Sequence, residues 1–282
     1  MQTILFPTDF SANAQRALEW AKLFARQYGA TIVVLHVHQP PMSDATLPTI
    51  GDLGMGAMAS VELEEIGREN VGKLVQQLQN EGFRAESDWR LGNVEDEIVH
   101  TANERDVDLI VTGRSELSGF FDRLIGSSAT DVARSATCPV LVVPNPSDEQ
   151  PLGPVKLRHI LYATQLEFDE SDSMRQTLAV ANAFEAGIQF IKVNADNQLN
   201  LYDDKKLMAH LRQQAGGPST SINTVDSRTV SAGLSEYLQN YPADLLVVTT
   251  RERGFWANLI DPGETEQIIT RSTVPVLVLH GN

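Results

Sequence analysis

Glycine and hydroxyl residues stand between two apolar runs in residues 111–144. Gly126, Ser127 and Ser128 come directly before a segment with helical periodicity. The start of a helix offers unpaired backbone N–H groups and the positive end of the helix dipole, and a glycine there lets an anion approach the backbone closely. These residues could therefore bind a phosphate group. The alternative is that Ser127 or Ser128 caps the helix without any ligand.

Three charged residues could complete such a site. Arg114 and Arg123 lie in the same stretch and could neutralise a phosphate, or could be solvated instead. Asp9, in the segment PTDFS, follows an apolar run and precedes a helical one. Its carboxylate could accept hydrogen bonds from a ribose hydroxyl or an adenine amino group, or could satisfy the N–H groups of its own turn. The sequence leaves both roles of Asp9 open.

Catalytic and metal-binding arrangements are not indicated. His36 and His38 have no matching cluster of metal ligands nearby in sequence and no identifiable serine or cysteine partner. The single cysteine, Cys138, excludes an intrachain disulfide and lies in the apolar segment TCPVLVVP, where we expect a buried thiol. Because no Walker-type G-K-[ST] segment is present, we predict no catalytic residue and no metal site.

The composition restricts the classes of partner. A formal net charge of −15 argues against a nucleic-acid backbone as ligand, since such binding depends on clusters of basic residues. No apolar run approaches the roughly 18 residues of a membrane span, and the start MQTILFPTDFS lacks the pattern of a signal peptide. We therefore expect a cytoplasmic protein that binds neither nucleic acid nor a membrane.

The sequence repeats itself, which predicts two tandem domains. Five segments recur in the same order: ILFPTDF with ILYATQL, TIVVLHVH with GIQFIKVN, DLIVTGR with DLLVVTTR, GFFDRLIG with GFWANLID, and CPVLVVP with VPVLVLH. The segment PNPSDEQPLGPVK, rich in proline and acidic residues, separates the copies. We expect domains over residues 1–146 and 155–282.

Each copy alternates short apolar runs with segments of helical periodicity. Such βαβ repetition predicts a parallel sheet with helices on both faces, in which Ser11 begins and Gly29 ends the first helix. Ligands of these sheets bind at the carboxyl ends of the strands. The candidate binding residues at that edge are Pro7, Thr8, Asp9, Val37, Gly113, Arg114, Gly126, Ser127 and Ser128.

Four segments together resemble a known family. The segments ILFPTDFSANAQRALEWA, VVLHVHQPP, GRSELSGFFDRLIGSS and CPVLVVP are similar to those of universal stress proteins, and the doubled chain resembles the tandem-domain members. The resemblance implies two Rossmann-like α/β domains, each with a five-stranded parallel sheet related to the adenine nucleotide α-hydrolase-like folds. It also implies intramolecular pairing of the last strands, residues 140–143 beside 276–279, and leaves a homodimer open.

The nucleotide-binding branch of this family uses the pattern glycine, two residues, glycine, nine residues, glycine, then serine or threonine. On this chain the first glycine falls on Gly113, the last on Gly126 and the hydroxyl on Ser127, but the middle glycine falls on Glu116. A carboxylate beside phosphates is unfavourable, so the resemblance implies adenosine or AMP-like binding more than triphosphate binding. It also implies that Asp9 contacts the base and that Val37 flanks the adenine.

The second copy departs further from the pattern. Gln165 replaces Asp9, Thr249 or Thr250 replaces Gly113, and the segment DPGE replaces GSSA. A proline and two acidic residues at a helix start remove an N–H donor and repel an anion. We predict that the second domain binds no nucleotide at this edge.

The resemblance implies a cytoplasmic stress-response module that binds ATP, ADP or AMP, with or without Mg²⁺, and an unidentified protein partner. Two alternatives stay open: a scaffold or interaction protein without a nucleotide, and a slow ATP hydrolase. Residues 40–65, which contain prolines, glycines and three methionines, could form a lid over the site or a long crossover loop. Matched aromatic residues, Phe120 and Phe121 with Phe255 and Trp256, are expected to pack in a core or between the domains.

Overall fold

A computed structural model describes residues 1–39, 53–114, 123–145, 155–164, 170–196, 222–251 and 263–281. The first half consists of β1 (Thr3–Pro7), α1 (Ala12–Tyr28), β2 (Thr31–His38), α2 (Leu53–Asn80), β3 (Arg84–Leu91), α3 (Val94–Glu104), β4 (Leu109–Gly113), α4 (Arg123–Ser135) and β5 (Val140–Val143). The second half consists of β6 (His159–Ala163), α5 (Ser171–Phe184), β7 (Gly187–Ala195), β8 (Ile222–Ser227), α7 (Val230–Asn240), β9 (Leu245–Arg251), α9 (Gly263–Arg271) and β10 (Val276–Gly281).

The first helix, α1, begins and ends as its sequence predicts. The Ser11 side chain accepts a hydrogen bond from the backbone N–H of Ala14, and Gly29 ends the helix in the left-handed conformation with φ of 63°. The apolar residues at helical spacing face the sheet, and Ala17, Ala21 and Phe24 are fully buried. The local signals and the packing of this helix therefore agree.

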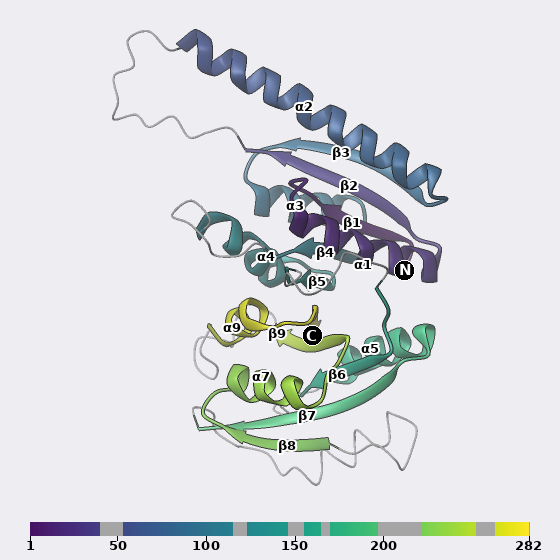
Figure 1. The fold of residues 1–282 in the computed structure, drawn as a ribbon, viewed down its shortest axis with the longest axis vertical. Helices are drawn as coiled ribbons and strands as arrows, with labels where there is room; N and C mark the ends of the chain where they lie inside the picture. The colour runs from purple at the N-terminus through teal and green to yellow at the C-terminus, as the bar shows by residue number, and fades with distance from the viewer. Residues whose placement is uncertain are drawn as a thin grey trace.

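The described strands form one ten-stranded sheet in the order β3-β2-β1-β4-β5-β10-β9-β6-β7-β8. Within each half the strands pair in parallel, whereas β5 and β10 pair antiparallel, with Leu141 opposite Leu277. Figure 1 shows the two halves joined end to end through these strands. The predicted α/β class and the predicted pairing of the last strands are both confirmed.

The hydrophobic core consists of two layers, one on each face of the sheet, and each layer contains residues from both halves. On one face Phe24 of α1 contacts Phe184 of α5 edge to face, with 5.1 Å between the ring centroids. On the other face His280 at the end of β10 forms a 3.0 Å hydrogen bond through Nε2 with the carbonyl oxygen of Ala133 in α4. Both layers of the core therefore cross the junction.

Two helices begin earlier than the sequence pattern indicated. Helix α2 begins at Leu53, so part of the insert expected to be a lid or loop is helical. Nine of the thirteen residues in 53–65 are leucine, methionine, alanine or glutamate, which favour helix, and no proline interrupts the helix. Helix α4 begins at Arg123, which places Gly126, Ser127 and Ser128 inside its first two turns rather than ahead of it.

The thiol of Cys138 is free and packs partly buried against the core. Burial raises the pKa of this thiol to about 11, so the thiol stays protonated at neutral pH. Among the described helices, none combines the length and apolarity that a membrane crossing requires.

Because the two halves share one core, we expect them to unfold together. Replacing Leu277 with alanine removes buried contacts at the junction and should lower the free energy of unfolding by about 2 to 5 kcal/mol. The substitution should destabilise both halves to the same extent, because the core crosses the junction between them. In a Trp256→Phe background the remaining tryptophans, Trp20 and Trp89, report on the first half in urea titrations, while circular dichroism reports on both.

We expect the two signals to share one midpoint, which Leu277→Ala shifts for both. As a control, Leu63→Ala on the exposed side of α2 should change stability by no more than about 0.5 kcal/mol. A fluorescence midpoint that stays in place while the ellipticity develops a separate earlier transition would show that the halves fold independently.

Candidate functional site

A cavity of about 280 Å³ opens at the carboxyl edge of the first half. It lies where β1 stands between β2 and β4, the point at which successive strands are added on opposite sides of β1. Its apolar wall consists of Leu35, Val37, Val94, Ile98, Ala129 and Val132. Its polar rim consists of Thr8, Asp9, Ser11, Asn13, His36 and Gln39.

The cavity brings together five residues that the sequence assigned to one site. Pro7 ends β1, Thr8 and Asp9 follow it, Val37 is at the end of β2, and Gly113 ends β4; all five line the cavity. They are far apart in sequence, and the parallel pairing of β1 with both β2 and β4 brings them to one edge. The juxtaposition therefore follows from the strand order.

The turn between β1 and α1 uses the carboxylate of Asp9. The backbone N–H of Ser11 donates to Oδ1 of Asp9 at 2.9 Å, and the N–H of Phe10 donates to Oγ1 of Thr8 at 3.0 Å. The turn-stabilising role of Asp9, one of the two considered from the sequence, is thus present. Because a carboxylate can accept several hydrogen bonds, this bond leaves acceptor capacity for a ligand.

Phe10, within this turn, has an unusual backbone conformation. Its φ is 63°, in the left-handed region, which costs a residue with a side chain about 1 to 2 kcal/mol. Strain of this kind persists only where the surroundings impose it, and it concentrates at functional sites. The Phe10 ring packs on the imidazole of His36, with 5.0 Å between the centroids. Nothing in the sequence pattern of PTDFS indicated this strain.

Gly113 is required by packing. A Cβ atom at this position would lie 2.9 Å from the carbonyl oxygen of Asn13 and 3.3 Å from the backbone nitrogen of Ala14. The end of β4 therefore touches the first turn of α1, and any side chain would push the helix outward. This close contact explains the glycine without reference to a phosphate, a reason that sequence reasoning missed.

Arg114, assigned from the sequence to phosphate neutralisation, points to the second half instead. Its Nη1 donates to the carbonyl oxygen of Ser272 at 2.9 Å and also to that of Ile269, both at the C-terminal end of α9. The carbonyl groups at a helix C-terminus carry partial negative charge and attract cations. The guanidinium of Arg114 therefore caps a helix across the junction, and its role as a phosphate ligand stays a prediction from the sequence.

Residues 126–128 lie within α4, and their role in binding a nucleotide stays a prediction from the sequence. A helix leaves unpaired the N–H groups of its first four residues, and α4 begins at Arg123. The unpaired donors of α4 therefore precede Ser127 and Ser128, whose own N–H groups belong to the helix. From the next turns of this helix, Ala129 and Val132 contribute apolar surface to the cavity.

Comparison with known proteins identifies the family to which this chain belongs. A sequence profile described as the universal stress protein family matches residues 1–144 and again residues 159–280. This chain belongs to the universal stress protein family. The two matches cover most of the chain and show two domains of this family in tandem.

Three relatives illustrate the extent of the similarity. Universal stress protein MJ0531 of Methanocaldococcus jannaschii is 30% identical over 148 residues, which is 52% of this chain and 84% of the relative. Universal stress protein YxiE of Bacillus subtilis is 29% identical over 147 residues, 50% of this chain and 97% of the relative. A solved universal stress protein of Archaeoglobus fulgidus covers 99% of this chain and 98% of its own at 21% identity, with a TM-score of 0.72, and shows that the tandem fold is shared.

The second universal stress protein domain has a different carboxyl edge. Ile4 pairs with Leu109 and Ile160 pairs with Leu245, a register that places Thr249 at the position of Gly113. Oγ1 of Thr249 is 3.1 Å from the hydroxyl of Tyr162, a fully buried residue.

Burial, and then the nearby Glu170 carboxylate, raise the pKa of the Tyr162 phenol well above its usual value. Glu170 is itself buried, hydrogen bonds to the Tyr162 side chain and stands at the start of α5. The Tyr162 hydroxyl thus interacts with both Thr249 and Glu170 at the second edge. At the corresponding place in the first half, Gly113 lines an open cavity.

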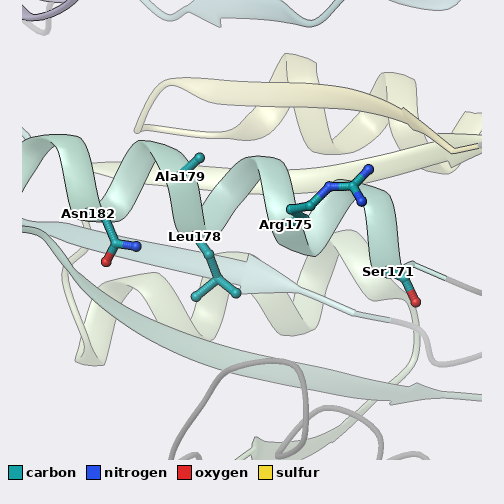
Figure 2. Close-up of a pocket in the computed structure, with 5 residues that line it drawn as sticks. All are labelled: Ser171, Arg175, Leu178, Ala179 and Asn182. Carbon is teal, nitrogen blue, oxygen red and sulfur yellow. The ribbon is translucent and has the colours of Figure 1, made fainter.

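A larger hollow, of about 430 Å³, lies along α5. Figure 2 shows that its described lining comes from this one helix, with Leu178 and Asn182 on the same side. Arg175, which also lines it, is paired with Asp172 at 2.5 Å. The described lining of the hollow contains none of the residues that the sequence assigned to a site.

Several sequence predictions fall outside the described residues. These are Glu116, Phe120, Phe121, Gln165, Phe255, Trp256, Asp261, Pro262 and the part of the insert in residues 40–52. The effect of Glu116 on a phosphate therefore stays a prediction from the sequence.

The packing of Gly113 can be tested by adding a single methyl group. We expect Gly113→Ala to lower the free energy of unfolding by about 1 to 3 kcal/mol, because the new Cβ collides with the backbone of α1. The matched control is Gly72→Ala in α2, where no atom lies within 4 Å of the new Cβ. That variant should gain about 0.5 to 1 kcal/mol from helix propensity. Equal urea midpoints for wild type and Gly113→Ala would contradict the close contact.

Proposed function

We propose that this protein binds one adenine nucleotide in the cavity of its first half and acts as a nucleotide-dependent regulatory or protective module of the cytoplasmic stress response. Membership of the universal stress protein family supports the stress role. The observation that carries the proposal is the cavity itself, which collects Pro7, Thr8, Asp9, Val37 and Gly113 at one sheet edge.

The chemistry of the cavity suits a nucleoside. Its apolar wall, with Leu35, Val37 and Ile98, offers a surface for a flat aromatic base. At the rim, the Asp9 carboxylate can accept hydrogen bonds from ribose hydroxyls or from an exocyclic amino group. The cavity thus offers an apolar surface for the base and a hydrogen-bond acceptor for the sugar or the amino group.

The size and charge of the site favour a ligand that carries one phosphate group or none. A volume of about 280 Å³ is near the lower end of ligand cavities, which commonly start near 300 Å³. The guanidinium of Arg114, the cation nearest in sequence to Gly113, is engaged by α9. We therefore expect adenosine and AMP to bind better than ATP, with any Mg²⁺ carried by the phosphates of the nucleotide.

We assign the second half a structural role in this function. Its edge is occupied by the contacts of Tyr162 with Thr249 and Glu170, and a bulky ligand would have to break them. This half also caps α9 with Arg114 and completes the core of the first half. These junction contacts support an alternative function, that of an interaction protein that binds no nucleotide.

Calorimetric titration with adenosine, AMP and ATP, with and without Mg²⁺, tests the proposal. We expect saturable binding of one AMP per chain, and a loss of affinity of about tenfold or more in Asp9→Ala because charge-assisted hydrogen bonds disappear. The matched control is Asp172→Ala, which removes a carboxylate from the first turn of α5 in the second half and should leave binding unchanged. Absence of binding by all three ligands would refute the nucleotide site.

A further inference from the structure

We propose that His36 is a positioning residue of the first-half site, which holds the Asp9 turn in the geometry that binds a ligand. The inference rests on the proposed function, because it concerns the turn that presents Asp9 to the cavity. Nδ1 of His36 lies 2.8 Å from the carbonyl oxygen of Thr8. A carbonyl oxygen can only accept, so this nitrogen carries a proton and donates it to the turn.

The turn needs support from outside itself. Two internal bonds, from Phe10 N–H to Thr8 and from Ser11 N–H to Asp9, close a loop in which Phe10 is left-handed. Relaxing the φ of Phe10 would break these bonds and redirect the Asp9 carboxylate. His36 opposes that change in two ways: its Nδ1 fixes the carbonyl of Thr8, and its ring packs on Phe10.

Helix α2 limits the movement of the imidazole from another direction. Gly67 is buried, and a Cβ added there would lie 3.2 Å from both Nε2 and Cδ2 of His36. The backbone of α2 therefore lies close to the ring, while Phe10 and the Thr8 carbonyl contact it from the turn. The imidazole is held by three elements, β2, α2 and the turn, so α2 supports the binding geometry without itself bearing Asp9.

Three variants distinguish the effect of the Nδ1 hydrogen-bond donor of His36 from the effect of its ring. His36→Phe retains an aromatic ring beside Phe10 but loses the Nδ1 donor. His36→Asn keeps a donor near the Nδ1 position but loses the ring. His38→Phe is the matched control, because His38 lies two residues farther along the same strand and face and stacks on Trp89 rather than on the turn. Thermal melts followed by circular dichroism check that each variant is folded.

Amide hydrogen exchange of Phe10 and Ser11 measures the turn without any ligand. We expect His36→Phe to accelerate exchange at both amides by about three- to tenfold, the ratio that corresponds to one lost hydrogen bond. His36→Asn should restore part of the protection, and His38→Phe should match wild type. Unchanged exchange at both amides in His36→Phe would overturn the positioning role, whatever the result with ligands.

A double-mutant cycle with AMP then tests whether His36 acts through Asp9. His36→Phe alone should weaken binding by about three- to tenfold, and should add little to the loss already caused by Asp9→Ala. Fully additive losses would overturn the claim that His36 acts through Asp9. If wild type binds no AMP, the proposed function fails, and the exchange experiment still decides whether His36 holds the turn.

Discussion

The antiparallel pairing of β5 with β10 is the interaction on which the architecture depends. Without it, each half would expose the backbone of an apolar strand, Val140–Val143 or Val276–Gly281, as an open edge suited to aggregation. The pairing covers both edges and extends each layer of the core across the junction. It also places α9 where Arg114 can cap it. A residue next to the first-half cavity thereby becomes part of the contact between the halves.

The two halves share a fold but differ where the fold places ligands. Both carry the same strand register, yet Gly113 and its cavity in the first half correspond to Thr249 and its contact with Tyr162 in the second. In the second half Tyr162 stands at the position of Phe6 and Thr249 at the position of Gly113, and the two hydroxyl groups of the second half contact each other. The difference illustrates that a fold supplies the place for a site, whereas individual residues decide whether the site exists.

Local and periodic signals allowed much of this structure to be predicted. The cap at Ser11 and the stop at Gly29 follow from short-range chemistry. The pairing of the last strands was expected from the resemblance to the tandem-domain members of the family. The candidate residues Asp9, Val37 and Gly113 were found because parallel strands end at one edge. Contacts between distant segments left no such signal. The partner of Arg114 lies 155 to 158 residues away, and the backbone that Gly113 touches belongs to α1.

A crystal structure of the whole chain soaked or grown with AMP tests most directly whether one half binds and the other does not. We predict one nucleotide per chain, with its base against Val37 and its ribose or amino group hydrogen bonded to Asp9. The Tyr162 hydroxyl should stay on Thr249 in the second half. A nucleotide at the second edge, or one bound in the first half away from Asp9, would contradict the assignment of the site.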